Sequence, residues 1–270
     1  HLQKTGVDEM SLWAFSDQDN SLDGEFIIVT GSWNLISIPV TAPDFRKDIL
    51  FPTAISKAFV YTNAYEIRDT LKIGPGYWLK FSGSSVEHVS GSDKLTEVIP
   101  VNAGWNLIGS VGKPVAVADI GLSSGLTIGT IYKYIGSYQP VTTITPGLGY
   151  WVKTNSSGTL TLTAPAGAAG KAENSVSDII TDFSSITFKD KNGNEQTLYL
   201  GRSGNRQITS SLFELPPLGP EGMFDVRFIT QRYVEIVPDE IEKSIQYKLS
   251  LHGVEYPIVV KWNIVEGANY

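Results

Sequence analysis

The 270-residue chain contains no cysteine, only three histidines and two methionines, and no long hydrophobic run. Without cysteine, disulfide frameworks, thiolate zinc sites and cysteine nucleophiles are excluded. No apolar stretch approaches the roughly 20 residues that span a bilayer, so membrane insertion is not expected. The net charge is −7, and no basic run is longer than Arg46-Lys47. Nucleic acid needs a clustered basic face and is not an expected partner.

The most informative feature present is an internal repeat. Trp33-Asn-Leu-Ile36 returns as Trp105-Asn-Leu-Ile108, 72 residues later. Residues 58–81 then align without gaps to residues 131–154 at an offset of 73, which superimposes two copies of a Gly-Tyr-Trp-x-Lys motif. Agreement over this length indicates a duplicated structural unit.

Each copy has the pattern of β-structure. Thr159 to Thr163 alternates with period 2, as a half-buried strand does, and helical periodicity is nearly absent. Only Asp48 to Lys57 and Val115 to Gly121 have a helix-like composition. Glycines before each Tyr-Trp pair predict a positive φ or a close approach to another backbone.

The last third differs in composition and has its own strand signals. Five strands are predicted, over Ser185–Asp190, Glu195–Gly201, Phe224–Thr230, Ile245–His252 and Tyr256–Ile264, which is typical of an immunoglobulin-like sandwich. Leu215 to Gly222, rich in proline and glycine, is predicted to be an exposed connection. The predicted organisation is an N-terminal segment or edge strand at 1–24, β-repeats at 25–98 and 99–165, a linker at 166–172 and the sandwich at 173–270.

The fold class expected is therefore all-β, with two pseudo-symmetric repeats of barrel-like or sandwich-like form followed by the immunoglobulin-like unit. The polar start and the missing initiator Met suggest a mature or excised fragment. We expect a monomer that is covalently linked to other domains in the full-length protein.

The tandem Trp-Asn-Leu-Ile blocks, each followed by Gly-x-Gly-Tyr-Trp-x-Lys, resemble the "GWNLIS-P" repeat modules of secreted and cell-surface bacterial and archaeal proteins. The C-terminal third, with Glu214-Leu-Pro-Pro217 and Met223 to Phe228, is similar to the sandwich that precedes type IX secretion sorting domains. The resemblance implies an extracellular or cell-surface location and no particular activity.

Signals for catalysis are weak, and we expect no enzyme, cofactor or metal site. Glu66 and Asp69 align with Gln139 and Thr142, so the repeats share no acid pair of the kind that glycosidases need. His88 is predicted to face solvent, opposite the valines of its strand. Three further features could bear chemistry, namely a copper-binding His1, a calcium-binding Asp17 to Asn20 and the acids after Pro238, but simpler structural roles explain each. Trp13 has no counterpart in the repeats and is expected to cover a sheet edge.

Aromatic residues, 29 in all, provide the leading hypothesis. An exposed Tyr or Trp face can stack on sugar rings, although a residue that recurs in both repeats is often required by the core. We predict a non-catalytic carbohydrate-binding module whose partner is a polysaccharide, such as a plant cell-wall glycan. The alternatives are a structural or adhesive spacer and, less favoured, a polysaccharide-cleaving enzyme. The predicted ligand-binding residues are Tyr65, Tyr138, Tyr61, Tyr134, Trp78 and Trp151.

Overall fold

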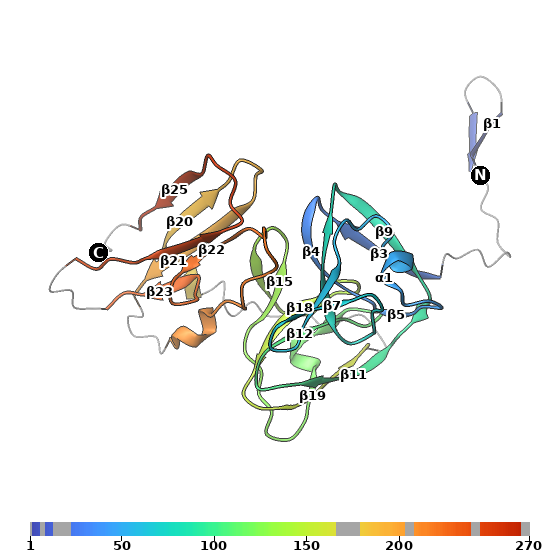
Figure 1. Ribbon diagram of the computed structural model, residues 1–270, viewed down its shortest axis with the longest axis horizontal. Coiled ribbons are helices and arrows are strands. Elements are labelled where there is room, and N and C mark those ends of the chain that lie inside the picture. The colour runs from blue at the N-terminus through green and yellow to red at the C-terminus, as the bar shows by residue number, and fades with distance from the viewer. Residues whose placement is uncertain are drawn as a thin grey trace.

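The computed structural model describes residues 2–5, 9–12, 23–165, 179–202, 208–238 and 244–265 (Figure 1). The fold is all-β, as predicted, with two β-repeats followed by a C-terminal unit resembling a β-sandwich. Before the repeats, β1 (Leu2–Thr5) and β2 (Glu9–Leu12) pair as an antiparallel hairpin. His1, Trp13, Asp17 to Asn20, the predicted linker and the acids at 239–242 lie outside the described residues.

The two repeats have the same strand topology. In each, a four-stranded antiparallel sheet is formed, with the order β4-β8-β6-β7 in repeat 1 and β12-β18-β15-β16 in repeat 2. The first and last long strands of each repeat also pair, β3 with β9 and β11 with β19. The strands of repeat 1 are β3 (Gly24–Val29), β4 (Ser32–Ser37), β5 (Val40–Thr41), β6 (Ala58–Tyr61), β7 (Tyr65–Arg68), β8 (Gly76–Phe81), β9 (Ser85–Ser90) and β10 (Ser92–Asp93).

Repeat 2 has one more described strand than repeat 1, namely β14, which extends the β11–β19 pair into a three-stranded sheet. Its strands are β11 (Thr96–Val101), β12 (Gly104–Ile108), β13 (Val115–Ala116), β14 (Gly121–Leu122), β15 (Ile131–Tyr134), β16 (Tyr138–Val141), β17 (Thr143–Ile144), β18 (Tyr150–Thr154) and β19 (Gly158–Thr163). Strand β11 crosses the predicted boundary between residues 98 and 99.

The helix-like segments form very little helix. Only α1 (Lys47–Leu50) forms from the first, and only the 3₁₀ turn η1 (Val117–Asp119) from the second. One turn fixes several dihedrals for a single hydrogen bond, so such short helices depend on packing for their stability. Leu50 is buried in the core of repeat 1 and supplies that packing.

Alternation along each strand separates two buried faces. In β8, Tyr77, Leu79 and Phe81 enter the core of repeat 1, whereas Trp78 points from the other face into a different cluster. In β18 of repeat 2, Tyr150 and Val152 enter that repeat's own core, and Trp151 points away from it. Each four-stranded sheet is therefore apolar on both faces, which explains the nearly continuous apolar runs in these strands.

The repeats are related by approximate two-fold symmetry, and two glycines meet where their backbones cross. A Cβ on Gly76 would lie 2.7 Å from the carbonyl oxygen of Ile108, and a Cβ on Gly149 would lie 2.8 Å from that of Ile36. The hydroxyls of Ser37 in repeat 1 and Ser110 in repeat 2 also meet at this crossing, 2.8 Å apart. The prediction that these glycines permit a close backbone approach is confirmed.

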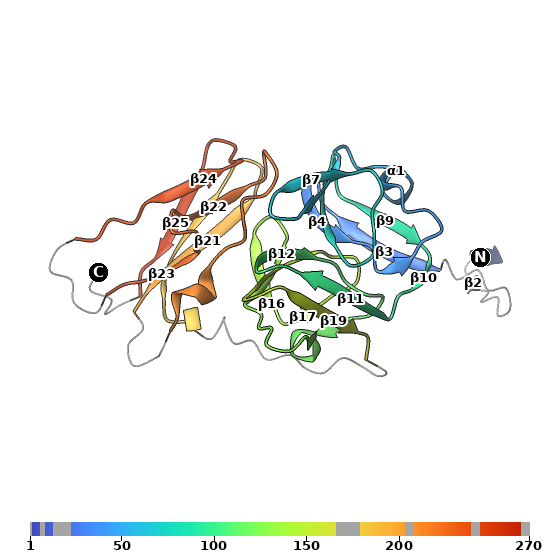
Figure 2. The same ribbon diagram turned by 60° about the horizontal axis from the view of Figure 1, so that its bottom comes forward.

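The C-terminal unit contains a four-stranded sheet, β23-β21-β20-β25, and a two-stranded sheet, β22-β24. The unit lies beside the repeats in both views, with β15 of repeat 2 next to it (Figures 1 and 2). Four strand predictions were close in position, and that for β24 began too early; β23, which pairs in parallel with β21, was missed. The elements are β20 (Ser184–Lys189), β21 (Glu195–Gly201), η2 (Ser210–Phe213), β22 (Asp225–Phe228), β23 (Val234–Ile236), β24 (Leu249–His252) and β25 (Val259–Asn263).

Candidate functional site at the junction of the three units

The second faces of the two repeat sheets share one aromatic cluster. Trp78 of repeat 1 packs edge-to-face on Tyr134 of repeat 2, with ring centroids 5.0 Å apart. The symmetry-related pair, Tyr61 and Trp151, has the same arrangement at 4.9 Å. Edge-to-face pairs of this kind add to the stabilisation that burial alone provides. The rings from the two repeats are thus interleaved and do not form a flat platform.

The C-terminal unit covers this cluster with one segment, residues 212–224, which we call the docking segment. Phe213, Leu215 and Phe224 of the segment are buried in the same hydrophobic cluster as the repeat aromatics. The prediction that Leu215 to Gly222 is an exposed connection is therefore wrong for its first part, because Leu215 is only 2% exposed. A proline-rich segment forms no regular ladder, so its free carbonyls can accept hydrogen bonds from neighbouring side chains.

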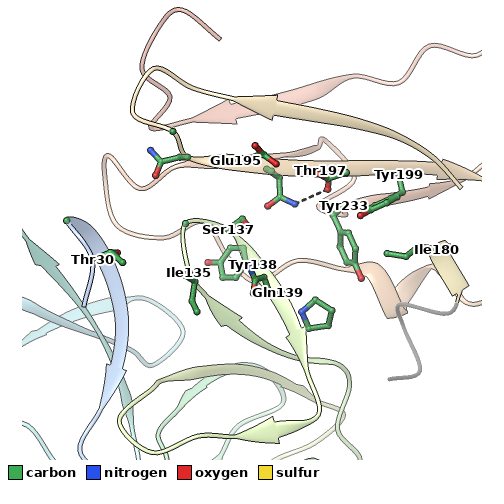
Figure 3. Close-up of a pocket in the computed structure, with 16 residues that line it drawn as sticks. Thr30, Ile135, Ser137, Tyr138, Gln139, Ile180, Glu195, Thr197, Tyr199 and Tyr233 are labelled. Atoms are coloured by element: carbon green, nitrogen blue, oxygen red, sulfur yellow. Dashed lines mark hydrogen bonds between the residues drawn. The ribbon is translucent and has the colours of Figure 1, made fainter. Parts of the chain in front are cut away.

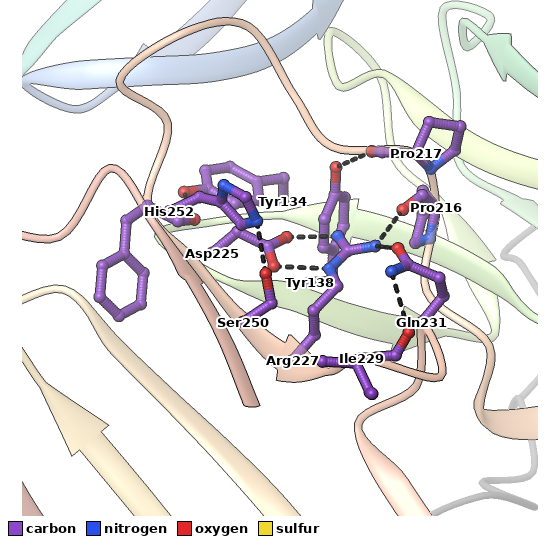
Figure 4. Close-up of polar contacts among 11 residues, drawn as sticks. Tyr134, Tyr138, Pro216, Pro217, Asp225, Arg227, Ile229, Gln231, Ser250 and His252 are labelled. Atoms are coloured by element: carbon purple, nitrogen blue, oxygen red, sulfur yellow. Dashed lines mark hydrogen bonds and ion pairs between the residues drawn. The ribbon is translucent and has the colours of Figure 1, made fainter. Parts of the chain in front are cut away.

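Three tyrosines of repeat 2 donate their hydroxyl protons to carbonyl oxygens of the docking segment. Tyr134 donates to Phe224 at 2.9 Å and Tyr132 to Leu212 at 3.2 Å. Tyr138 donates to Pro217 at 3.3 Å (Figure 4). Burial raises the pKa of all three hydroxyls, so they remain protonated donors.

Polar contacts to the C-terminal unit extend to both repeats. The indole N–H of Trp33 in repeat 1 donates to the Glu221 carbonyl oxygen at 3.2 Å. In repeat 2, the Lys153 ammonium lies 2.7 Å from both carboxylate oxygens of Glu214. These contacts fix the C-terminal unit against both halves of the duplication.

A buried ion pair supports the docking segment from inside the C-terminal unit. The Arg227 guanidinium binds both oxygens of Asp225, and it donates to the Pro216 carbonyl oxygen at 2.7 Å and to Gln231 Oε1 at 3.1 Å (Figure 4). The Arg227 side chain is fully buried, with its guanidinium carbon 6.0 Å from the centre of the Tyr138 ring. The pair therefore links the fold of the sandwich to its contact with repeat 2.

The six predicted ligand-binding residues lie together, but they do not form the exposed platform that binding would need. Trp78 and Trp151 are 0% exposed, Tyr134 and Tyr138 are almost completely buried, and Tyr61 and Tyr65 are half-buried. The Tyr65 hydroxyl and the indole nitrogens of Trp78 and Trp151 have no hydrogen bond of good geometry with the described residues. Trp78 approaches the Tyr65 hydroxyl and opposes the rise of its pKa, which burial dominates. These rings cannot stack on a sugar without separating the units.

The residues considered for catalysis are dispersed. Glu66 pairs with Arg68 at 2.5 Å and Asp69 with Lys57 at 3.4 Å, both as surface ion pairs. His88 lies on the more exposed face of its strand, half-buried against Phe26 with ring centroids 4.6 Å apart. It is opposite Val89, as predicted, but Val86 shares its face and is itself exposed. Within the described ranges, no group of three or more His, Asp or Glu could hold a metal ion.

A cleft of about 610 Å³ with a mixed polar and apolar lining runs along the junction beside the aromatic cluster. One wall is the β15–β16 hairpin of repeat 2, and the other is β21 with the turn before it (Figure 3). Thr30 of repeat 1 lies at one end and Ile180 at the other. Of the residues predicted as ligand-binding, only Tyr138 lines it.

Sequence reasoning missed the docking segment and the residues of the cleft. The one available signal was the spacing of Phe213, Leu215, Met223 and Phe224 among the prolines, because large apolar residues in an exposed loop would be unusual. Their contacts with repeat 2 bridge long stretches of sequence, such as the 90 residues between Tyr134 and Phe224, so no local pattern could identify them.

No family model matches the chain, and no curated protein or solved structure matches it. No helix in the described ranges is long and apolar enough to cross a membrane.

Proposed function

We propose that the chain is a non-catalytic structural module of an extracellular or cell-surface protein, which holds neighbouring domains at a fixed separation. The observation that carries the proposal is the use of the repeat aromatics. Rings from both repeats interleave with one another, and the docking segment covers them with hydrogen bonds from Tyr132, Tyr134 and Tyr138. Three units joined through a shared apolar cluster resist bending better than units on a polar linker.

The extracellular location is part of this proposal and rests on the resemblance of the repeat motifs. Absence of cysteine is compatible with it and does not favour it. The six aromatic residues are buried or half-buried, which argues against carbohydrate binding by their rings. The spacer therefore replaces carbohydrate binding by these residues as the leading hypothesis.

The proposal is tested by measuring the distance between spin labels in solution. The chain has no native cysteine, so Ser82→Cys and Asn192→Cys place one label on repeat 1 and one on the C-terminal unit, both at exposed positions. Ser82→Cys with Ser157→Cys, one label on each repeat, is the reference pair. We expect distance distributions of similar width for the two pairs. A much broader distribution for the first pair would show that the C-terminal unit moves independently and would contradict the spacer.

The polysaccharide-cleaving alternative is tested separately with a reducing-end assay on cellulose, xylan, mannan and chitin. The spacer proposal expects no release of new ends above the level of heat-denatured protein. Release by the native chain would contradict it.

A further inference from the structure

We propose that the cleft between the β15–β16 hairpin and β21 binds a neutral oligosaccharide. The cleft contains residues from all three units and exists only when the C-terminal unit is docked. Its volume, about 610 Å³, is within the range of about 300–1,000 Å³ that is usual for small-molecule sites.

The lining of the cleft combines side-chain amides, hydroxyls and tyrosine rings. Gln139 is exposed on one wall, and within the described part of the chain its amide forms no hydrogen bond. On the opposite wall, Gln196 uses its Nε2 to donate to the Thr197 carbonyl oxygen at 2.9 Å, which leaves its Oε1 as an acceptor. An amide both donates and accepts, as a sugar hydroxyl does, so the two groups are complementary.

Tyr199 and Tyr233 form the apolar part of the same wall (Figure 3). Their rings pack edge-to-face with centroids 6.4 Å apart, and Tyr199 remains half-buried. The Tyr233 hydroxyl is buried beside that of Tyr132 without a hydrogen bond of good geometry to any described residue. Sugars present C–H faces to aromatic rings and hydroxyls to amides, which matches this mixed lining.

Charge favours a neutral ligand over an anionic one. Among the described residues, no lysine or arginine lines the cleft, and the one charged lining residue is Glu195, whose carboxylate is 3.8 Å from the Lys189 ammonium. Phosphorylated ligands and acidic glycans require cationic or guanidinium partners, which this wall does not provide.

The edge of the hairpin disfavours an extended peptide. Strand β16 is the outer strand of its sheet, and a peptide would pair with its free edge. Pro140 occupies this strand and has no N–H to donate, whereas the equivalent position in repeat 1 is Ile67. An oligosaccharide needs no backbone ladder and is unaffected by the proline.

The test is calorimetric titration of the full chain with cellohexaose, xylohexaose and mannohexaose, with hexagalacturonate as the anionic comparison. We expect at least one neutral hexasaccharide to bind and hexagalacturonate to bind more weakly. Gln139→Ala should weaken binding about fivefold, as expected for the loss of one hydrogen bond. The matched control is Glu66→Ala, at the equivalent position of repeat 1, which should leave the affinity unchanged.

Ser137→Ala, on the same hairpin, provides a second variant that should weaken binding less than Gln139→Ala. The inference is overturned if no neutral hexasaccharide binds, if hexagalacturonate binds as tightly, or if Gln139→Ala and Glu66→Ala have equal effects. The label-distance measurement on the same preparation separates this result from the spacer proposal. A narrow distance distribution without binding removes the cleft site and leaves the spacer intact.

Discussion

The two repeats carry the same aromatic motif, but they meet the C-terminal unit differently. Repeat 2 presents Tyr132, Tyr134 and Tyr138, whose three hydroxyls all donate to the docking segment. The equivalent residues of repeat 1 are Phe59, Tyr61 and Tyr65. Phe59 has no hydroxyl, and neither tyrosine of this set donates a hydrogen bond of good geometry to a described residue.

This difference shows that a duplicated aromatic residue has two separate roles, one for its ring and one for its hydroxyl. The ring is kept in both copies because each four-stranded sheet must bury its second face against the other repeat. Whether the ring carries a hydroxyl that donates a hydrogen bond depends on the unit that the repeat contacts. The one C-terminal sandwich contacts the two repeats differently. Repetition therefore identifies residues that the fold uses without showing whether they are exposed.

The largest effect on the contact with repeat 2 is expected from the buried ion pair. Arg227→Met removes the guanidinium and leaves the Asp225 carboxylate buried without its partner, which should reduce the free energy of unfolding of the C-terminal unit by about 3–5 kcal/mol. Chemical denaturation followed by far-ultraviolet circular dichroism, which reports on all three units, measures the change. Arg46→Met is the control and should have little effect, because the Arg46 side chain, which pairs with Asp44, is 67% exposed. Equal effects of the two variants would contradict the structural role of Arg227.

The two-fold relation between the repeats is tested by the crossing glycines. Gly76→Ala and Gly149→Ala each place a Cβ within 3 Å of a backbone oxygen of the other repeat, where flexible side chains cannot relieve the contact. Each should lower the free energy of unfolding by about 1–3 kcal/mol. Gly83→Ala, with open space around its Cβ, should be nearly neutral. If only one of the two substitutions lowered the free energy of unfolding, the two symmetry-related contacts would not contribute equally to stability.

Much of the fold was predictable because its determinants are local. The repeat appears directly in the sequence, and the alternation along β19 and the strand predicted at β20 are both confirmed by the structure. Gly-rich turns before each Tyr-Trp pair predicted the close approach of Gly76 and Gly149.

The candidate site was not predictable because it depends on contacts between units. Because Trp78 and Trp151 recur at equivalent positions of the two repeats, the sequence indicated that the core could require them. The burial of Tyr138, however, depends on a segment almost 80 residues later in the chain. The cleft has the same origin, since Gln139 and Gln196 come from different units. Local patterns determine which face of a strand is apolar, and only the tertiary arrangement determines what covers that face.

A smaller effect should distinguish the equivalent tyrosines Tyr138 and Tyr65. Tyr138→Phe removes the hydroxyl that donates to Pro217 and leaves that carbonyl without its partner, so a loss of about 1 kcal/mol is expected. Tyr65→Phe removes a buried hydroxyl that has no bond of good geometry and should be neutral or slightly stabilising. Thermal unfolding of both variants in one buffer measures the difference. An equal loss from both would mean that the repeats meet the C-terminal unit alike.

The smallest expected difference is between the equivalent lysines Lys153 and Lys80. Both ammonium groups lie about 6 Å from the ring of a repeat tryptophan, so the cation–π contact is common to the two. Only Lys153 also reaches a carboxylate, that of Glu214, and the pair is partly exposed to solvent. Lys153→Met should therefore cost up to about 1 kcal/mol more than Lys80→Met at low salt. The excess should shrink in about 1 M NaCl, where exposed charges are screened over roughly 3 Å. An excess that persists in high salt would indicate that packing of the lysine stem, and not its charge, fixes repeat 2 to the docking segment.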